Sequence, residues 1–455
     1  MKYSDWLKRR NQINQPIGIE AGSLHSILFP YQRDIVRWAL IRGRACIFAD
    51  TGLGKTLMQC EWARHIPGRV LILAPLSVAQ QTVKEAQKIG LDIAYDRSGN
   101  SAAQVVITNY EMMEHSNFGD FTGIVLDESS ILKNYSGRIR NQIIQSADVV
   151  PYRLACTATP APNDHMELGN HSEFLGVKTR VEMLSEYFVH DGGSTQNWRL
   201  KGHCKDLFWK WVCSWAAMIK RPSDFGYSNE GFNLPPLIEE LVEFPVDDSD
   251  AREAGLLFAE AARSLSDQRA VRRSTTEARA RIISEMAPKD EPVLIWCEYN
   301  DEADLITSSI PDAVQIAGSD TIDSKIDKLN GFAECRYRVL VTKPSIAGFG
   351  LNWQHCACMF FAGPSHSFEQ TYQSIRRCWR FGQTRPVKVY TIAAETETAV
   401  IENYKRKQAE AEEMAERMVE HINAKSYQKA VITAKREWNA YEPSKKMEVP
   451  SWLAY

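Results

Sequence analysis

The chain has 455 residues and a mass of 51.7 kDa, which is enough for two or three domains. Hydrophobic residues make up 44% and charged residues 24%, so a mostly disordered chain and a fibrous one are excluded. The net charge of −3 excludes a uniformly basic surface but not a local basic groove. No apolar run is long enough to span a bilayer, and the polar first residues carry no secretory signal, so we expect a cytoplasmic protein without membrane contact.

The first half of the chain repeats one unit, in which a short apolar run is followed by a loop and an amphipathic stretch. Runs of this kind that alternate with helical patterns are typical of a parallel sheet buried on both faces. The predicted strands are Arg44–Phe48, Val70–Ala74, Val105–Thr108, Gly123–Leu126 and Tyr152–Cys156, and the clearest helices are Thr56–His65 and one that begins near Ser77.

The same pattern stops after Thr159 and returns at Val293. Residues 161–235 are rich in aromatic side chains and poor in clean strands, so we expect an inserted, mainly helical region there. The sequence therefore predicts an α/β fold with two parallel-sheet lobes in tandem and a helical, aromatic-rich insert. The predicted strands of the second lobe are Val293–Cys297, Val339–Thr342, Met359–Ala362 and Val387–Thr391, and charged helices are expected within Asp250–Met286 and over Glu397–Asn423.

The most specific motif spans residues 49–56, between a predicted strand and a predicted helix. Gly52 and Gly54 let backbone N–H groups turn inward around phosphate oxygens, and the helix N-terminus adds a positive dipole. Lys55 would contact the β- and γ-phosphates, and Thr56 would offer its hydroxyl to magnesium. The first position is alanine rather than glycine, which is a mild departure. The motif predicts a phosphate-binding loop.

Two carboxylates follow another predicted strand, Gly123–Leu126. Asp127 would hold magnesium through water, and Glu128 would orient and deprotonate the attacking water. An apolar run that ends in Asp-Glu is weak by itself, because most such strand ends are merely solvated. Together with the phosphate loop it predicts the hydrolysis of a nucleoside triphosphate, with magnesium as cofactor.

Further short segments complete a family pattern, among them Leu28-Phe-Pro-Tyr-Gln32, Leu73-Ala-Pro-Leu-Ser77 and Cys156-Thr-Ala-Thr-Pro160. With them, the chain from about Leu28 to about Thr391 resembles the superfamily 2 helicases and translocases, in particular the Swi/Snf-type DNA-dependent ATPases in a compact form. The resemblance implies two RecA-like lobes and ATP as the nucleotide. It also assigns expected roles: Gln32 and Gly350 would contact ATP, Thr157 and Thr159 would couple the nucleotide to the nucleic acid, and Pro75, Ser77, Thr108, Asn109, Cys297 and Ser345 would contact the nucleic acid.

One position departs from the family pattern. The acidic strand end continues to Lys133 and Asn134 as the family does, but Ser130 stands where a histidine is usual. The change leaves the hydrolytic residues intact and alters the contact that usually couples hydrolysis to the nucleic acid.

Residues 372–383 contain Gln373, Arg377, Arg380 and a final Gly-Gln at the family's spacing. The resemblance implies that Arg377 and Arg380 are arginine fingers and that Gln373 is a coupling residue. A guanidinium group suits the charge spread over the γ-phosphoryl oxygens in the transition state. The spacing of three predicts that both arginines share one face of a helix. Without the other motifs, a solvated basic helix end would be the commoner meaning.

The insert contains four tryptophans, which allow two interpretations. Trp211 and Trp215 are four residues apart, a helix-face spacing that favours a small aromatic core. Trp198 lies near a pair of glycines, so it is the better candidate for a wedge or a stacking platform for bases.

The resemblance implies an ATP-dependent DNA translocase or helicase that moves along or remodels duplex, forked or branched DNA without reading its sequence. An RNA helicase, an ATP-gated binding module and a motor subunit of a larger complex are the alternatives. The compact length suits a bacterial or viral enzyme, in a bacterial or infected-host cytoplasm. The expected domains are an N-terminal extension (1–27), a first lobe with the phosphate loop (28–160), the insert and linker (161–235), a second lobe with the arginine fingers (236–395), and a C-terminal helix and tail (396–455).

Overall fold

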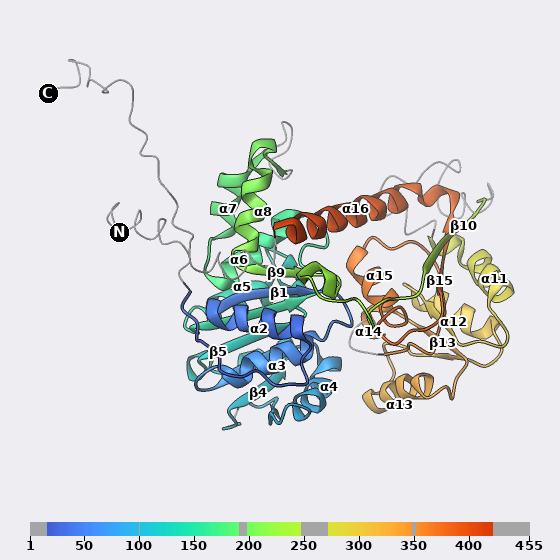
Figure 1. The fold of residues 1–455 in the computed structure, drawn as a ribbon. Helices are drawn as coiled ribbons and strands as arrows, with labels where there is room; N and C mark the ends of the chain where they lie inside the picture. Colours follow the sequence, from blue (N-terminus) through green and yellow to red (C-terminus); the bar gives the residue numbers. More distant parts are fainter. Residues whose placement is uncertain (1–15, 100, 191–197, 247–271, 348–351, 422–455) are drawn as a thin grey trace, which may run out of the picture.

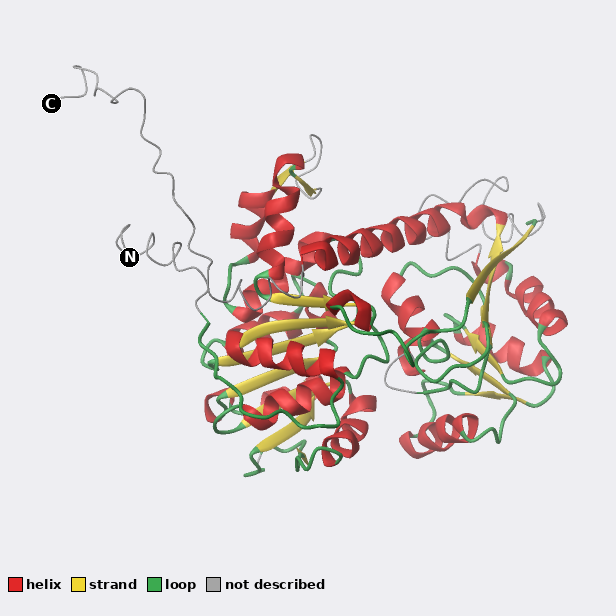
Figure 2. Ribbon diagram, viewed as in Figure 1, coloured by secondary structure: helices red, strands yellow, loops and turns green. Residues whose placement is uncertain are grey.

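The computed structural model describes residues 16–99, 101–190, 198–246, 272–347 and 352–421. The chain forms two lobes, each built on its own parallel sheet, as the sequence predicts (Figure 1). Helices lie against both faces of each sheet (Figure 2). Both faces of the central strands are therefore covered, which is why these strands read as continuous apolar runs.

The first lobe contains a seven-stranded sheet in the order β3-β4-β2-β5-β6-β1-β9, with every pairing parallel. Its strands are β1 (Arg44–Ala49), β2 (Val70–Ala74), β3 (Ala94–Tyr95), β4 (Val105–Asn109), β5 (Gly123–Asp127), β6 (Tyr152–Thr157) and β9 (Ala216–Ile219). Its helices are α2 (Pro30–Arg42), α3 (Lys55–His65), α4 (Leu76–Gln87), α5 (Arg138–Ala147), α6 (Leu168–Leu175), α7 (Arg180–Tyr187) and α8 (Lys205–Cys213).

The second lobe contains a six-stranded parallel sheet in the order β10-β15-β14-β11-β13-β12. Its strands are β10 (Leu237–Phe244), β11 (Val293–Trp296), β12 (Ala313–Gln315), β13 (Val339–Thr342), β14 (Cys358–Phe361) and β15 (Val387–Ala394). Its helices are α11 (Thr276–Met286), α12 (Asn300–Ser309), α13 (Ile322–Ala333), α14 (Pro344–Ala347) and α15 (Phe368–Ile375), and α16 (Thr398–His421) follows β15.

The sequence pattern does not predict the strands at the edges of the two sheets. β10 carries glutamates among its apolar residues and lies at the sheet edge, so its side chains are mostly exposed and no buried-strand pattern forms. β9 was expected to belong to the helical insert, but it pairs with β1 and completes the first sheet. The short strands β3 and β12 were also missed. The part of Asp250–Met286 that precedes Arg272 lies outside the described residues.

The insert otherwise follows the helical prediction and closes over an aromatic core. Trp209 and Trp215 are buried, and the Trp211 ring packs 5.4 Å from the Trp215 ring and 5.3 Å from that of Tyr187. The aromatic-core interpretation is confirmed for these three tryptophans. A two-stranded antiparallel hairpin, β7 (Phe188–His190) with β8 (Trp198–Leu200), extends from this region.

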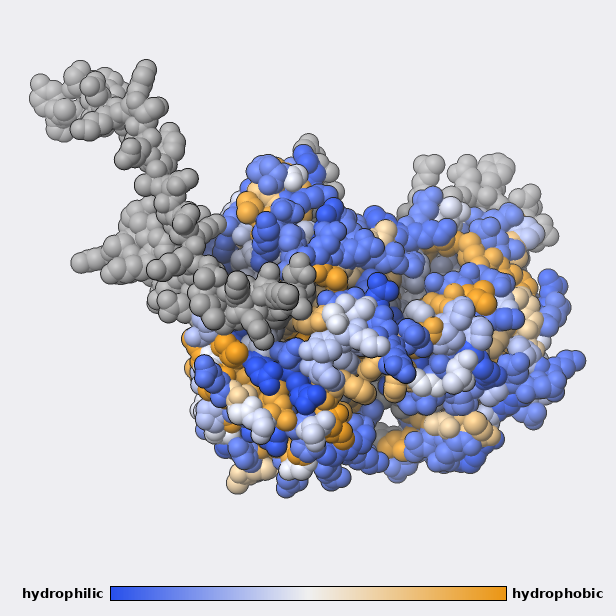
Figure 3. Space-filling view, in the orientation of Figure 1, coloured by the Kyte–Doolittle hydropathy of each residue, from blue (hydrophilic) through white to orange (hydrophobic). Residues whose placement is uncertain are grey.

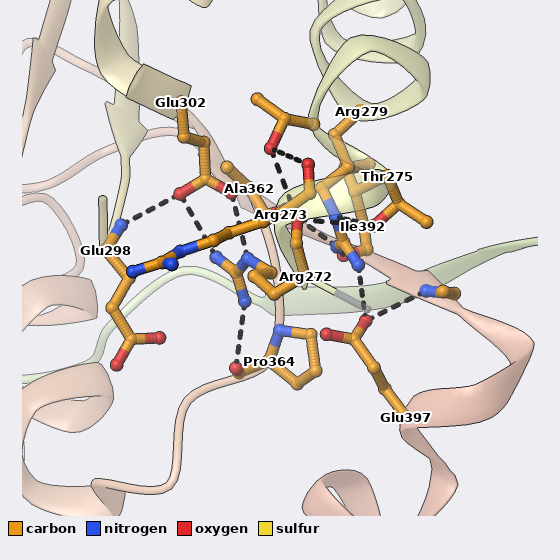
Figure 4. Close-up of polar contacts among 12 residues, drawn as sticks. Arg272, Arg273, Thr275, Arg279, Glu298, Glu302, Ala362, Pro364, Ile392 and Glu397 are labelled. Carbon is orange, nitrogen blue, oxygen red and sulfur yellow. Dashed lines mark hydrogen bonds and ion pairs between the residues drawn. The ribbon is translucent and has the colours of Figure 1, made fainter. Parts of the chain in front are cut away.

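Two buried arginines fasten the second lobe internally (Figure 4). Arg279 donates to the carbonyl oxygens of Ala362 at 2.9 Å and Ile392 at 2.6 Å, and its other nitrogen lies 2.7 Å from a Glu397 carboxylate oxygen. Arg272 binds both carboxylate oxygens of Glu302, at 2.9 and 3.2 Å. Buried charges are tolerated when each has a partner and hydrogen bonds, as here. Arg279 thus ties α11 to the ends of β14 and β15, and Arg272 ties the segment before α11 to α12.

Helix α16 leaves the second lobe and ends against the first (Figure 1). Its last turns insert Met414, Ala415 and Met418 into the first lobe's hydrophobic core. The Cys213 thiol donates to the carbonyl oxygen of Met418 at 3.5 Å, which ties α16 to the end of α8. The outward side of α16 is largely hydrophilic (Figure 3). α16 therefore forms a second connection between the lobes. In the part of the chain that the structure describes, no helix is long and apolar enough to cross a membrane.

We expect Met418→Ala to lower the free energy of unfolding by about 2 kcal/mol or more, because it leaves a cavity where a fully buried side chain contacted the first lobe. Chemical denaturation monitored by tryptophan fluorescence measures the change. Arg417→Ala is the matched control, since Arg417 makes only an exposed pair with Glu420. Equal stability of the two variants would show that α16 does not pack on the first lobe.

Candidate active site

The phosphate loop connects β1 to α3, and its glycines adopt a backbone that few other residues accept. Gly52 has φ of 89° and Gly54 has φ of 78°. The Lys55 ammonium donates to the carbonyl oxygen of Ala49 at 2.7 Å, so it already points across the loop. Burial lowers the pKa of Lys55, and the nearby carboxylates of Glu128, Asp50 and Asp127 oppose that shift. Lys55 is therefore a buried cation that is suited to bind an anion.

Asp127 is the last residue of β5 and is fixed by two groups that sequence reasoning did not find. The Gln59 amide donates to its Oδ1 at 2.8 Å, and the Tyr110 hydroxyl donates to its carbonyl oxygen at 2.7 Å. Gln59 follows Lys55 by four residues, so both lie on one face of α3. That spacing was the available signal. Burial raises the pKa of Asp127, which Gln59 and Lys55 only partly offset.

Glu128 adopts a left-handed backbone, with φ of 57°, which is unusual for a residue with a side chain. The Thr157 hydroxyl donates to its Oε1 at 2.5 Å, and the Ser130 hydroxyl lies 3.4 Å from the same oxygen. Burial raises the pKa of Glu128 despite Lys55 and Thr157. A raised pKa and a constrained backbone are common features of a catalytic base. Ser130, the departure from the family pattern, therefore faces the candidate base.

Both candidate arginine fingers lie in the turn after α15. The prediction that they share one face of a helix is wrong. α15 ends at Ile375, and the carbonyl oxygen of Arg377 accepts a hydrogen bond from the backbone of Trp353 at 2.8 Å. Arg377 and Arg380 therefore lie beyond the end of α15. The Arg377 guanidinium donates to the Gln373 carbonyl and amide oxygens at 2.9 and 3.0 Å.

Arg377 comes from the second lobe yet interacts electrostatically with Glu128 of the first. The pKa of Arg377 is lowered to about 10, chiefly by burial and then by the charge of Arg380, while Glu128 opposes the shift. Burial also lowers the pKa of Arg380. The structure therefore brings the candidate finger Arg377 toward the same site as Lys55 and Glu128.

Some residues that are expected to contact the nucleotide or to couple it to the nucleic acid form hydrogen bonds within the protein. The Gln32 amide donates to the carbonyl oxygen of Leu53 at 2.8 Å, and its own oxygen accepts from the Phe29 backbone at 2.9 Å. Gln32 thus buttresses the phosphate loop. The Thr159 backbone donates to the Thr157 hydroxyl at 3.1 Å, which links the two coupling residues. Gly350 lies outside the described residues.

The candidate nucleic-acid contacts lie where neighbouring parallel strands end. In the first lobe, Pro75 follows β2, while Thr108 and Asn109 end β4, which pairs with β2. In the second lobe, Cys297 follows β11 and Ser345 follows β13. Cys297 and Ser345 line a common hollow with Lys343 and Gln370. Ser77 is the second residue of α4, but its side chain is outside the description. Trp198 packs on His190, with ring centroids 3.6 Å apart, so it is half-buried within the hairpin.

Polar contacts join the lobes beside this site. Lys133 pairs with Glu369 of α15. The Lys407 ammonium, on α16, donates to Asn163 Oδ1 at 2.9 Å and to the His366 carbonyl oxygen at 2.8 Å. The lobes therefore contact each other along a seam that includes the phosphate loop.

Glu167 lies near this seam and accepts two hydrogen bonds from Asn163, at 2.8 and 3.2 Å. Burial raises the pKa of Glu167 to about 7, and Asn163 and Lys133 only partly offset the effect. Glu167 therefore titrates near neutral pH in the folded chain.

Comparison with known proteins identifies the family. Residues 29–168 match the DEAD/DEAH box helicase family, and residues 277–382 match the helicase conserved C-terminal domain. These two ranges cover more than half of the chain and contain the phosphate loop, the acidic strand end and the arginine-rich turn. The chain belongs to the helicases that contain these two domains. The helicase is accordingly a nucleic-acid-dependent ATPase with two RecA-like lobes.

Two curated proteins resemble the helicase. An uncharacterized ATP-dependent helicase, YqhH of Bacillus subtilis (strain 168), is 21% identical over 424 residues, which cover 80% of this chain and 75% of that protein. The SNF2 domain-containing protein ENL1 of Oryza sativa subsp. japonica is 27% identical over 217 residues, 38% of this chain and only 22% of the rice protein. Among solved structures, the Sulfolobus solfataricus SWI2/SNF2 ATPase core in complex with dsDNA is 18% identical, with a TM-score of 0.41, covering 93% of this chain and 100% of that one.

We expect Glu167→Gln to change the pH dependence of stability. A carboxyl group whose pKa is raised in the folded state binds its proton more tightly there, so this group lowers stability as pH rises from its ordinary pKa near 4.5 to about 7. The variant should therefore gain stability over wild type at pH 8 and differ little at pH 4. Urea denaturation at both pH values measures this, with Glu420→Gln on exposed α16 surface as control. A gain of equal size at both pH values would contradict the assignment.

Proposed function

We propose that the helicase is a magnesium- and ATP-dependent translocase that moves along duplex, forked or branched DNA without reading its sequence. The observation that carries this proposal is the split site. Lys55, Asp127 and Glu128 belong to the first lobe, and Arg377 of the second lobe interacts electrostatically with Glu128. A site completed by two lobes responds to ATP by closing and to hydrolysis by opening.

Thr56 and Asp127 are the residues that would hold magnesium. The fit is chemical: Asp127 is a buried carboxylate whose positive neighbour Lys55 does not fully offset its burial, and hard oxygen donors suit this ion. When bound, magnesium would neutralise charge that develops on the phosphates. Among the described residues there is no group of three or more His, Cys, Asp or Glu side chains that could hold a metal. A site of one carboxylate, one hydroxyl and substrate phosphates does not require one.

The remaining steps fall to the protein's own side chains. Lys55 and the backbone of the phosphate loop would hold the triphosphate, and Glu128 would take the proton of the attacking water through its Oε atoms. Arg377 and Arg380 would stabilise the negative charge on the γ-phosphoryl oxygens. Thr157 bonds Glu128 directly, so it would report the state of the phosphate to the rest of the first lobe.

Movement would follow from gripping a nucleic-acid backbone with both lobes. Both groups of candidate contacts lie at strand ends, one group on each lobe, so opening and closing would change their separation. Backbone contacts are independent of sequence and weaken with salt. The choice of DNA over RNA is supported by the motif pattern around Gln373.

We expect Glu128→Gln to abolish ATP turnover and to spare ATP binding, because only the proton acceptor is lost. Steady-state hydrolysis and binding of a fluorescent ATP analogue separate the two effects. Glu114→Gln, at an exposed ion pair on the same lobe, is the control. Turnover near the wild-type rate would remove Glu128 from the mechanism.

The nucleic-acid partner is tested by measuring ATP hydrolysis alone and with single-stranded DNA, duplex DNA, forked DNA or RNA, with Lys55→Ala as the inactive control. We expect duplex or forked DNA to stimulate hydrolysis most, with stimulation falling as salt rises. Stimulation by RNA alone would overturn the DNA assignment. No hydrolysis under any condition would instead favour an ATP-gated module or a motor subunit that requires its partner.

A further inference from the structure

Arg376 of the second lobe contacts the phosphate loop. It lies next to the candidate arginine fingers Arg377 and Arg380 but is not part of that pair. The Arg376 guanidinium lies 2.5 Å from Oδ2 of Asp50, the loop residue that directly follows β1. The Tyr372 hydroxyl donates to the other oxygen, Oδ1, of the same carboxylate. One carboxylate of the first lobe is therefore held by two side chains of the second.

This contact differs from the ion pairs on the surface. Only 8% of the Arg376 side chain and 13% of the Asp50 side chain are exposed, so both charges are largely desolvated. Burial alone would lower the pKa of Arg376, but Asp50 and Tyr372 raise it above its ordinary value. Removal of one partner from such a pair leaves an uncompensated buried charge.

Aromatic rings hold Arg376 in its conformation. Its guanidinium carbon lies 4.3 Å from the centroid of the Trp379 ring and 5.1 Å from that of Tyr372. The Trp379 indole donates to the carbonyl oxygen of Pro235, in the linker between the lobes, at 2.7 Å. Arg376 is thus preorganised between the linker and the phosphate loop.

Asp50 in turn is fixed within the loop. Its Oδ1 accepts from the Thr51 backbone at 2.6 Å, and its own backbone donates to Ile219 of β9 at 2.9 Å. The second lobe touches the loop again two residues later, because a Cβ atom at Gly52 would lie 3.2 Å from the Cβ of Phe381. One turn of the second lobe therefore contacts the phosphate loop through both a polar and an apolar contact.

We propose that Arg376, together with Tyr372, is a positioning residue that seats the second lobe on Asp50 and so sets the placement of Arg377 and Arg380 relative to Lys55. Arg376 adjoins Arg377 in the sequence and contacts no phosphate in this role. The seat is made by side chains of the protein alone. This inference rests on ATP binding at the phosphate loop within the proposed function, and it is independent of which nucleic acid stimulates the enzyme.

The test is a double-mutant cycle with Arg376→Gln, Asp50→Asn and the combined variant. We expect each single change to lower the stimulated kcat about 10²-fold, the loss typical of misplaced catalytic groups, with a smaller effect on KM for ATP. The combined variant should be no slower than the slower single variant, because both changes break the same contact. Arg376→Lys, which keeps the charge but not the fork, should recover part of kcat.

A second readout follows the lobes without nucleotide or nucleic acid. Dyes on the exposed Cys335 of the second lobe and on a Gln80→Cys substitution in α4 report their separation by energy transfer. We expect the transfer efficiency to fall by the same amount in both single variants and the combined one. Arg37→Gln, at an exposed pair in the first lobe, should change neither readout.

Losses in kcat that multiply in the combined variant, or an unchanged nucleotide-free transfer efficiency, would overturn the proposal. Circular dichroism identifies any variant that fails to fold, and Arg376→Lys then decides the outcome in its place. If the wild-type helicase hydrolyses no ATP with any nucleic acid, the proposed function fails, while the energy-transfer measurement still decides whether Arg376 seats the lobe.

Discussion

The carboxyl edges of two separate parallel sheets meet at one seam, and the chemistry of this helicase depends on that meeting. The loop after β1 carries Lys55, and the turn that follows α15 carries Arg377. Burial of either charged side chain within its own lobe costs free energy, because the charge loses its hydration. Burial lowers the pKa of Lys55 and of Arg377 and raises that of Glu128. Charges of the first lobe itself oppose the shifts of Lys55 and Glu128, whereas the shift of Arg377 is opposed across the seam by Glu128. A triphosphate would enter a site whose charged groups are already desolvated and oriented.

The ion pairs between the two lobes differ in how deeply they are buried, and therefore in how firmly they hold the lobes together. The Asp50–Arg376 pair is nearly buried, whereas the Lys133 side chain is 39% exposed where it pairs with Glu369. Exposed pairs contribute little and exchange readily with water. Since α16 also returns from the second lobe to pack on the first, the lobes are joined at two places along the chain.

Rigidity inside the second lobe matters as much as contact across the seam. Arg279 bonds carbonyl oxygens at the ends of β14 and β15, and Arg272 bonds the carbonyl oxygen of Pro364 at 3.2 Å, ahead of α15. Gly363 leaves the space that the Arg272 side chain occupies. The loop that leads to the candidate arginine fingers is therefore anchored to the sheet. A finger on an anchored loop can be placed to a fraction of an ångström when the whole lobe moves as one body.

The sequence alone determined the two-lobe fold, the phosphate loop at Lys55 and the acidic strand end at Asp127 and Glu128. These features are local: buried parallel strands read as apolar runs, and a phosphate loop needs its glycines and lysine in one short segment. Tertiary structure decided what local pattern cannot encode. β9 joins the first sheet by pairing with β1, Trp353 binds the carbonyl oxygen of Arg377 beyond the end of α15, and Asp50 meets Arg376 across more than 300 residues of chain. Contacts between segments so far apart in sequence form only when both sheets have folded and packed. The periodicity and spacing of residues in the sequence therefore do not predict them.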